Sequence, residues 1–241
     1  MPRADEVRAE YLLTDTLEPS AIAAAAAILS DSEKARAASF LRPQHRRDYI
    51  AAHALLRQAL SRRFPLPARE WSFEVRPGGK PALAAPFAQT AGLSFNLAHT
   101  GGLVACIVAD GVEAGIDVES VDRAGDSLAI ARRYFASNEH ARLEKCAPEA
   151  RARRFVELWT LKEAVLKATG AGITASLDGF SFETDDSLAI RFDAPAGERA
   201  ADWQFGLFAP SSSYRLAVAI RRPAQDARAI TAAAVKLETA Y

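Results

Sequence analysis

The rest of the sequence is best interpreted around one stretch, Phe155-Val-Glu-Leu-Trp-Thr-Leu-Lys-Glu-Ala-Val-Leu-Lys-Ala-Thr-Gly170. Residues recur in it at steps of three and four, which predicts a helix with two dissimilar faces. One face is apolar and suited to burial, and it consists of Phe155, Leu158, Leu161, Val165 and Ala168. The other face holds Trp159, Glu163 and Lys167, so an acid and a base lie four residues apart. Gly170 and Gly172 supply the stop signal. Taken alone, the stretch is also explained by a surface helix with an ordinary Glu–Lys pair.

Length and composition describe an ordinary globular protein. The 241 residues suffice for one large domain or two small ones, and the contents of 49% hydrophobic and 25% charged residues are typical. Thirty basic and thirty acidic side chains cancel, so no global field indicates a nucleic acid or an anionic membrane as partner. The segment from Lys34 to Arg63 is an exception, because it contains eight basic residues and one acid, Asp48. Such a segment either faces a polyanion or is simply solvated.

The cysteines and the N-terminal residues favour a cytoplasmic location. Cys106 and Cys146 have neither metal-binding nor redox spacing, which predicts free thiols in a reducing compartment. Met1 is followed by polar, mixed-charge residues rather than an apolar signal core, and no run approaches the roughly 18 apolar residues of a membrane span. We therefore expect a soluble cytoplasmic protein.

The predicted elements come in two similar series. The first series has helices over 19–41 and 44–63, then strands over 71–75, 93–97, 103–109 and 112–118, the last two joined by a hairpin turn at Asp110-Gly111. The second has helices over 126–134, 138–146 and 155–170, then strands over 179–183, 188–192, 203–207 and 215–220. The order predicts an α+β protein of two similar halves, residues 1–122 and 123–241, and a cleft between two such halves is a common place for a site. The alanine-rich tail after Pro223 has no assignment.

A pair of carboxylates lies in Gly115-Ile-Asp-Val-Glu119. Residues two apart on a strand point the same way, so Asp117 and Glu119 project side by side. Two adjacent carboxylates repel each other and require either a cation between them or an exposed strand end. Oxygen ligands without His or Cys neighbours favour Mg²⁺, which usually keeps waters and binds substrate phosphates.

Several residues are candidates to bind those phosphates. Lys80 follows two glycines in a turn, and glycine lets the backbone approach an anion closely. His99 lies between a strand end and Gly101-Gly102, and Arg46 and Arg47 belong to a basic helix that Arg36 precedes. Each of these features is weak alone, since turns, lone histidines and basic helices are common. Together with a third carboxylate, Glu163, they describe a Mg²⁺–phosphate site suited to phosphoryl-type transfer, with a base for an attacking hydroxyl.

Four motifs resemble those of one known family. Gly115-Ile-Asp-Val-Glu119 followed by Trp159-Thr-Leu-Lys-Glu-Ala-Val-Leu-Lys167 is similar to the signature pair of the Sfp-type 4′-phosphopantetheinyl transferases. Gly79-Lys-Pro81 and Phe95-Asn-Leu-Ala-His99 resemble the two upstream motifs of that family. The four motifs occur in the family order.

The resemblance implies an enzyme that moves the phosphopantetheine arm of coenzyme A onto a serine of an apo acyl or peptidyl carrier protein and releases 3′,5′-ADP. It implies a pseudo-dimer of the two α+β halves, with the active site in the cleft between them. It also implies Mg²⁺ on the coenzyme pyrophosphate, held by Asp117, Glu119 and Glu163. Catalytic roles fall to Asp117, to Glu163 as base for the carrier serine, and to Lys167 on the transferred phosphate. The coenzyme contacts it implies are Arg36, Arg46, Arg47, Lys80, Pro81, His99, Thr100 and Lys167. The expected partner is a carrier protein of fatty acid, polyketide or peptide synthesis, with no nucleic acid or membrane, and the expected state is a monomer.

The chain departs from the family pattern at one motif position. The family commonly has Ser before the His, where this chain has Ala98, and Thr100 is the candidate to replace that hydroxyl. The basic helix has no fixed spacing that would choose among Arg36, Arg46 and Arg47. Two alternatives stay open: a non-catalytic module that binds coenzyme A or a carrier protein, and a Mg²⁺-dependent nucleotide hydrolase.

Overall fold

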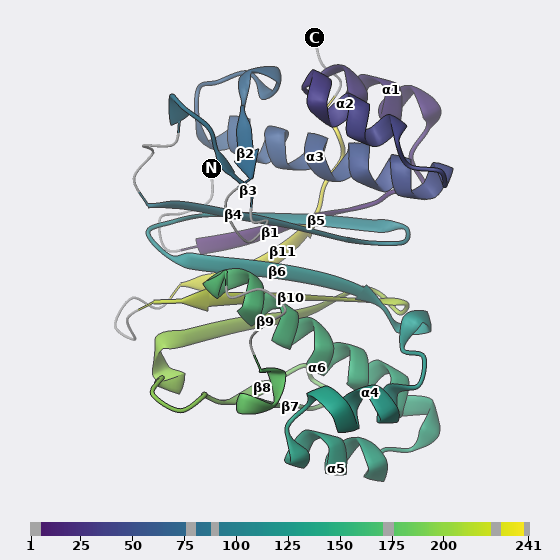
Figure 1. Ribbon diagram of the computed structural model, residues 1–241, viewed down its shortest axis with the longest axis vertical. Coiled ribbons are helices and arrows are strands. Elements are labelled where there is room, and N and C mark those ends of the chain that lie inside the picture. Colours follow the sequence, from purple (N-terminus) through teal and green to yellow (C-terminus); the bar gives the residue numbers. More distant parts are fainter. Residues whose placement is uncertain (1–5, 76–80, 88–91, 171–175, 223–227, 239–241) are drawn as a thin grey trace. The chain divides into compact units, whose positions relative to one another are not determined.

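The chain folds as two compact units. The structure, a computed structural model, describes residues 6–75, 81–87, 92–170, 176–222 and 228–238 (Figure 1). Unit 1 comprises residues 1–112 together with 229–241, and unit 2 comprises residues 113–228. The predicted division at 122/123 is corrected in two ways: the boundary lies ten residues earlier, and the C-terminal segment returns to unit 1. The reason is strand pairing, which joins residues 113–120 to unit 2 and residues 229–234 to unit 1.

Unit 1 is built on a four-stranded sheet with the order β11-β1-β5-β4. Its strands are β1 (Glu6–Leu13), β4 (Leu93–Thr100), β5 (Leu103–Asp110) and β11 (Ala229–Ala234). The prediction of a buried central strand at 103–109 is confirmed, because β5 lies between β1 and β4 and only Asp110 among its residues is exposed. Neither β1 nor β11 was predicted, and the two pair in parallel. A small hairpin, β2 (Phe73–Val75) with β3 (Pro81–Leu83), completes the strands described in this unit.

Helices cover the sheet of unit 1. They are α1 (Pro19–Ala27), α2 (Asp31–Ala38) and α3 (Pro43–Arg63), which agrees with the predicted helical regions. The longest, α3, packs against β1, β4 and β5 and buries leucines such as Leu55 and Leu60 in a core that includes Val104. The predicted capping signal at Ser30 is confirmed: its hydroxyl accepts from the amide of Glu33, and its own amide donates to Glu33 Oε2 at 2.8 Å.

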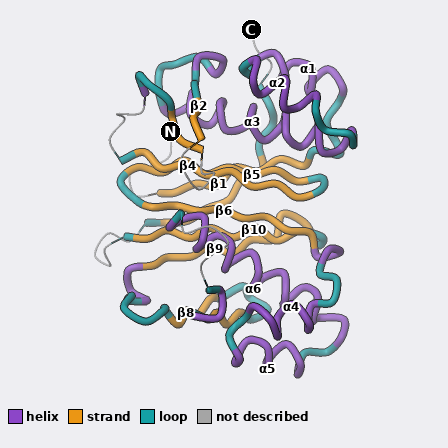
Figure 2. The backbone as a smooth tube through the Cα atoms, viewed as in Figure 1, coloured by secondary structure: helices purple, strands orange, loops and turns teal. Residues whose placement is uncertain are grey.

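Unit 2 also packs a long helix on a sheet, but its sheet is antiparallel throughout, whereas that of unit 1 is mixed. The sheet has the order β6-β10-β9, formed by β6 (Glu113–Ser120), β9 (Trp203–Ser211) and β10 (Tyr214–Arg221). A separate hairpin contains β7 (Ser181–Thr184) and β8 (Ile190–Asp193). The helices are α4 (Ser127–Tyr134), α5 (Ser137–Lys145) and α6 (Pro148–Thr169), drawn in purple in Figure 2, and α6 packs along β6 and β10. The predicted α+β class with two similar halves is therefore confirmed.

The hairpin predicted at Asp110-Gly111 is wrong. The strand after this turn, β6, pairs antiparallel with β10, about one hundred residues later, in the register Asp117↔Ala217 and Glu119↔Arg215. An Asp-Gly pair favours a tight turn, but the turn does not dictate which sheet the next strand joins. In the described part of the chain, no helix is long and apolar enough to cross a membrane.

Helix α6 is the stretch with which the sequence analysis began, extended by seven residues at its N-terminal side. It begins at Pro148, a residue well suited to the first turn, and it ends where Gly170 adopts a left-handed conformation with φ of 71°. All five residues of the predicted apolar face are buried. Trp159, Glu163 and Lys167 are partly exposed, so the second face is where the helix meets open space.

Candidate functional site

The carboxylate pair lies on the face of β6 that α6 covers. Asp117 and Glu119 are two residues apart and point to the same side of the strand. Asp117 is 6% exposed and Glu119 is half-buried. The alternative of a solvated strand end is therefore excluded for Asp117. A buried carboxylate requires a compensating partner.

Small residues bring helix and sheet together at this point. Gly115 lies on β6 on the same face as Asp117, and its register partner on β10 is Ala219. Ala217, opposite Asp117, and Ala219 belong with Ala164 and Ala168 of α6 to one buried cluster. Because no large side chain separates the elements, the backbone of α6 approaches β6 closely at Gly115.

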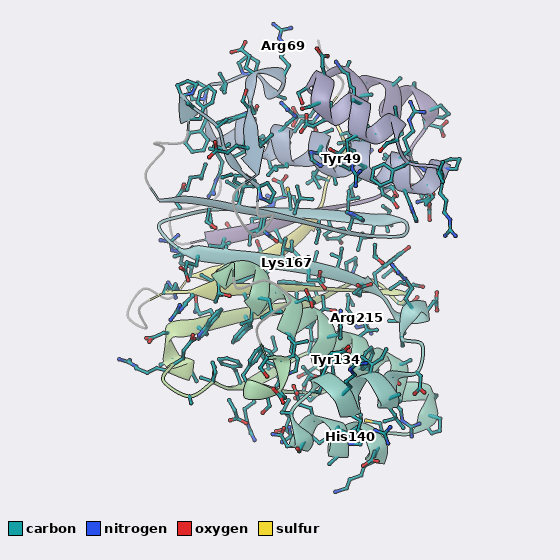
Figure 3. The ribbon with its side chains drawn as sticks, in the orientation of Figure 1. Tyr49, Arg69, Tyr134, His140, Lys167 and Arg215 are labelled. Carbon is teal, nitrogen blue, oxygen red and sulfur yellow. The ribbon has the colours of Figure 1, made fainter. Side chains whose placement is uncertain are left out.

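This approach joins Lys167 to Asp117. Lys167 lies on the last turn of α6 (Figure 3). Its ammonium donates to Asp117 Oδ1 at 2.7 Å, and its side chain remains 30% exposed. Glu163 lies one turn earlier on the same face of the helix. All three predicted metal ligands thus belong to unit 2, whereas the predicted halves had divided them. The correction follows from the pairing of β6 with β10.

The charges of the three carboxylates influence one another. Burial raises the pKa of Asp117, and the neighbouring Lys167 opposes that rise. Burial also raises the pKa of Glu163, with a further increase from the negative charges of Asp117 and Glu119 and an opposing effect of Lys167. A carboxylate with a raised pKa is a better base near neutral pH than an ordinary one.

The donor set fits a hard divalent cation. Asp117 Oδ2 is buried and has no hydrogen-bond partner among the described residues, so one carboxylate oxygen is left for a ligand. In that same part of the chain, no three acidic, His or Cys side chains already form a metal cage. Mg²⁺ does not need one, because it is typically held by one or two carboxylates, waters and substrate phosphates.

A pocket of about 160 Å³ opens beside Glu119. Its walls are mainly apolar and include Ile130, Phe155 and Trp159, with Arg123 at the same site. The centroid of the Trp159 ring lies 6.0 Å from that of Phe155, so the two rings form one continuous part of the pocket wall. The pocket supplies space next to the carboxylate face of unit 2.

In unit 1, part of the predicted coenzyme-binding set gathers around the end of β4. His99 is exposed there, while Ala98 and Thr100 are both buried on the opposite face, so Thr100 does share the side of the strand on which Ala98 lies. Asp48 of α3 accepts hydrogen bonds from Thr14 and from Gln44, the latter at 3.0 Å. Burial raises the pKa of Asp48, and the Thr14 hydroxyl, the Gly102 amide and His99 oppose that rise. The first turns of α3 therefore adjoin the β4–β5 turn.

The three candidate arginines are not equivalent. Arg47 hydrogen-bonds to Gln44 and lies 4.0 Å from Asp15. It therefore lies where the start of α3 adjoins the β4–β5 turn, next to the strand end that carries His99, a place that we call the His99 corner. Arg36 packs over the ring of Phe40, 5.2 Å from its centroid. Arg46 is exposed. Pro81 begins β3, and Lys80 lies outside the described residues.

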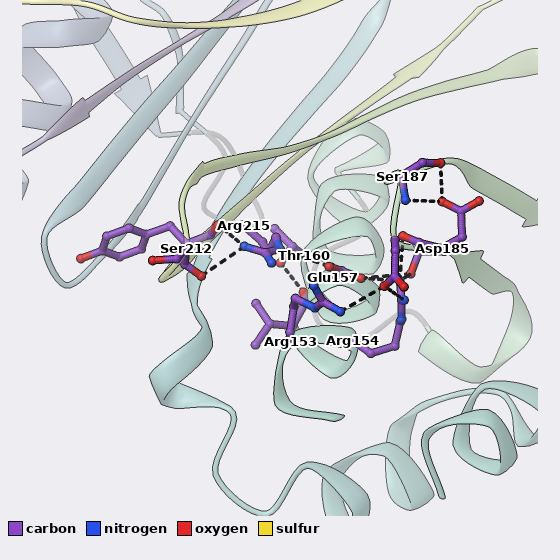
Figure 4. Close-up of polar contacts among 12 residues, drawn as sticks. Arg153, Arg154, Glu157, Thr160, Asp185, Ser187, Ser212 and Arg215 are labelled. Atoms are coloured by element: carbon purple, nitrogen blue, oxygen red, sulfur yellow. Dashed lines mark hydrogen bonds and ion pairs between the residues drawn. The ribbon is translucent and has the colours of Figure 1, made fainter. Parts of the chain in front are cut away.

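Sequence reasoning missed two buried charge clusters that hold α6 in place. Lys162 is completely buried, with Nζ 2.8 Å from Glu139 Oε2 and hydrogen bonds to the carbonyls of Leu177 and Phe180. Glu157 accepts from Arg154 at 2.7 Å and from Arg215 at 3.1 Å (Figure 4). One signal was available, since Lys162 follows the apolar residue Leu158 by four positions and so lies beside the apolar stripe.

Comparisons with known proteins agree with this division of the chain. A model described as the 4′-phosphopantetheinyl transferase superfamily matches residues 113–219, and one described as 4′-phosphopantetheinyl transferase, N-terminal, matches residues 17–110. The border between the two matches coincides with the border at 112/113 between the units.

Individual relatives carry the same family name. The 4′-phosphopantetheinyl transferase psf-1 of Bacillus pumilus is 30% identical over 175 residues, which cover 73% of this chain and 71% of that protein. The 4′-phosphopantetheinyl transferase HetI of Nostoc sp. is 38% identical over 61% of this chain and 62% of its own length. Among solved structures, a holo-(acyl-carrier-protein) synthase from Bacillus anthracis aligns with 46% of this chain and 97% of its own, with a TM-score of 0.40 and 18% identity.

These matches define the class to which the protein belongs. The chain is a member of the 4′-phosphopantetheinyl transferase superfamily, as the four motifs predicted. It spans about three fifths of the length of two of its curated relatives, HetI and a putative transferase of Synechocystis sp..

Proposed function

We propose that the protein is a Mg²⁺-dependent 4′-phosphopantetheinyl transferase that modifies a serine of an apo carrier protein. The observation that carries the proposal is the meeting of Glu163 and Lys167 with Asp117 in a chain of this family. In the proposed reaction the serine oxygen forms a bond to the phosphorus that carries the pantetheine arm. The bond between that phosphorus and the bridging oxygen of the pyrophosphate breaks, and 3′,5′-ADP leaves with that oxygen.

Glu163 is proposed as the base that accepts the proton of the serine hydroxyl. Its raised pKa, caused by burial and by the charges of Asp117 and Glu119, supports this role. Lys167 is proposed to hold the phosphate that is transferred, because its ammonium is partly exposed on the same helix face. Mg²⁺ bound through Asp117, Glu119 and Glu163 would neutralise charge on the pyrophosphate.

The corner of unit 1 around His99 is proposed to bind other phosphates of coenzyme A. His99 and Arg47 are the cationic candidates that the contacts support, with Thr100 as a hydroxyl nearby on β4. Lys80 and Pro81 remain part of the proposal through the motif Gly79-Lys-Pro81. Arg36 and Arg46 remain part of it as candidates from the basic segment. We further propose that the protein is a monomer and that it is located in the cytoplasm. The free thiols of Cys106 and Cys146 agree with that location.

The substitution Glu163→Gln tests the proposal. It preserves the shape of the side chain and removes the base, so transfer from coenzyme A to an apo carrier should fall by about 10²-fold or more, while the melting temperature does not fall. Transfer is measured as the gain of one phosphopantetheine arm in the intact mass of a panel of apo carriers. Glu149→Gln, in the exposed first turn of α6, is the matched control and should transfer normally.

Other outcomes would assign a different function. Near-normal transfer by Glu163→Gln would reject the role of this residue. Binding of coenzyme A by the unaltered protein without any mass gain across the carrier panel would indicate a binding module. Release of phosphate from nucleotides without a carrier would indicate a hydrolase.

A further inference from the structure

The ion pair between Lys167 and Asp117 lies where the proposed function puts a metal ion. Lys167 Nζ contacts Asp117 Oδ1 at 2.7 Å, while the buried Oδ2 of the same carboxylate has no hydrogen-bond partner among the described residues. Only one oxygen of the Asp117 carboxylate is therefore paired. Oδ1 accepts a hydrogen bond from the Lys167 ammonium, whereas Oδ2 is buried away from water without a hydrogen bond from the described residues.

When no metal is bound, the Lys167–Asp117 ion pair supplies a positive charge next to the buried carboxylate. The negative charges of Asp117 and Glu119 disfavour the ionised form of Glu163, and Asp117 is itself almost fully buried. A buried carboxylate needs a compensating cation, and among the described residues Lys167 forms an ion pair with Asp117. A divalent metal would supply the same compensation with twice the charge, so ammonium and metal are alternatives for one position.

We propose that Lys167 is an internal counter-ion that competes with the metal for Asp117 until coenzyme A draws it away. The inference rests on the proposed function, since it takes the phosphate of coenzyme A as the second partner of Lys167. Without coenzyme, the ammonium occupies Asp117 and repels a divalent cation. With coenzyme, the ammonium moves to the phosphate, Asp117 is released, and metal binds tightly.

The geometry of Lys167 suits an exchange between two partners. Its side chain is 30% exposed, although Asp117 is buried, so the ammonium can leave without unpacking the core. A lysine side chain has a flexible four-carbon stem and a compact charge, and neither requires one fixed orientation. Lys162, by contrast, is fully buried and bonded to Glu139 and two carbonyls, which identifies it as a fixed structural charge.

The rival explanation is that Lys167 serves to hold Asp117 in the orientation that a metal requires. The two explanations predict opposite signs for one measurement. A competitor weakens metal binding when coenzyme is absent, so its removal should strengthen that binding. An orienting residue supports metal binding, and its removal should weaken it.

The experiment is a titration of the full chain with Mn²⁺, followed by the electron paramagnetic resonance signal of the free ion. Without coenzyme A, Lys167→Met should bind Mn²⁺ at least about fivefold more tightly than the unaltered protein, the lower end of usual coupling between two ligands. Lys167→Arg keeps the charge and should gain no affinity. Lys34→Met removes one positive charge from an exposed position in α2 and controls for net charge.

A second titration adds coenzyme A, with Mn²⁺ and coenzyme alone as baseline. Coenzyme should tighten Mn²⁺ binding to the unaltered protein more than to Lys167→Met, because only the former has a counter-ion to release. Equal or weaker Mn²⁺ binding by Lys167→Met without coenzyme overturns the inference, as does equal coupling in both proteins. The carrier mass assay is separate: transfer by the unaltered protein together with either of these results would refute the counter-ion and leave the transferase standing.

Discussion

Gly115 on β6 and Ala164 on α6 lie so close that no side chain fits between them. A Cβ at position 115 would overlap the carbonyl oxygen of Ala164 and the amide nitrogen of Ala168, and both of these are backbone atoms. Backbone cannot yield as the end of a flexible side chain can, so the absence of a side chain at Gly115 sets the distance between helix and strand. That distance in turn fixes how Lys167 meets Asp117.

Gly115→Ala should therefore impair stability and site geometry together. Helix α6 must shift away from β6, with a cost of about 1–3 kcal/mol in the free energy of unfolding, and transfer should slow because the carboxylates and Lys167 move apart. Urea denaturation and the carrier mass assay measure the two effects. Gly179→Ala is the control in the same unit, because a Cβ there meets nothing within 4 Å. A Gly115→Ala protein as stable and active as the original would show that α6 does not depend on this contact.

Lys162→Met should destabilise unit 2 by about 3–5 kcal/mol, since it leaves Glu139 buried without its cation. Glu139→Gln should also be costly, because it leaves the Lys162 charge buried without a counter-charge. The double variant should lose less than the sum of the single losses, with an interaction energy of at least about 1 kcal/mol. Chemical denaturation of all four proteins provides the measurement. Additive losses would mean that the two side chains contribute independently.

Glu33 should make stability depend on pH in the acid range. Burial tends to raise the pKa of Glu33, but His53, the Ser30 amide and Arg57 lower it to about 2, below the ordinary 4.5. The ionised group therefore stabilises the fold fully above pH 4.5 and loses this contribution as the pH falls toward 2. Glu33→Gln should cost roughly 2 kcal/mol at pH 7, allowing for screening by solvent.

Urea denaturation at several pH values checks this expectation for Glu33. The difference between Glu33→Gln and the unaltered protein should narrow as the pH falls from 4.5 toward 2. A difference that stays constant across that range would exclude ionisation of Glu33 as its source.

Arg47→Ala should raise the KM for coenzyme A more than Arg36→Ala does, by about tenfold for the loss of one charge-assisted contact. The reason is position: Arg47 shares the corner of Asp15, Thr14 and the β4–β5 turn, whereas Arg36 packs on Phe40. Steady-state kinetics with coenzyme as the varied substrate, at saturating carrier, separates KM from kcat. Equal effects of the two substitutions would mean that the coenzyme phosphates do not distinguish Arg47 of α3 from Arg36 of α2.

The sequence was sufficient for the helices and for the family. The apolar face of α6, the α3 helix and the cap at Ser30 follow from local periodicity and capping chemistry, and tertiary packing agrees with them. The motif carboxylates were found because adjacent acids on a strand are costly without a cation. Such features depend on neighbours within a few residues, which the sequence displays directly.

The pairing of strands that lie far apart in the sequence could not be predicted from such local patterns. β11 is rich in alanine, a residue that favours helices, yet it forms a strand because β1 offers an open edge. β6 joins β10 across about one hundred residues, and the local Asp110-Gly111 signal indicated a nearer partner. The full burial of Lys162 was equally hidden, because its compensation comes from Glu139 and from carbonyls beyond the end of α6.

The return of the chain to unit 1 has a consequence for biosynthesis. β11 is translated only after every residue of unit 2, so unit 2 can fold on the ribosome as one contiguous segment. Until β11 emerges, the outer edge of β1 exposes unpaired backbone groups of the kind that recruit foreign strands. The nascent protein thus passes through a stage in which all of unit 2 has been synthesised while the edge of β1 in unit 1 still lacks its partner strand.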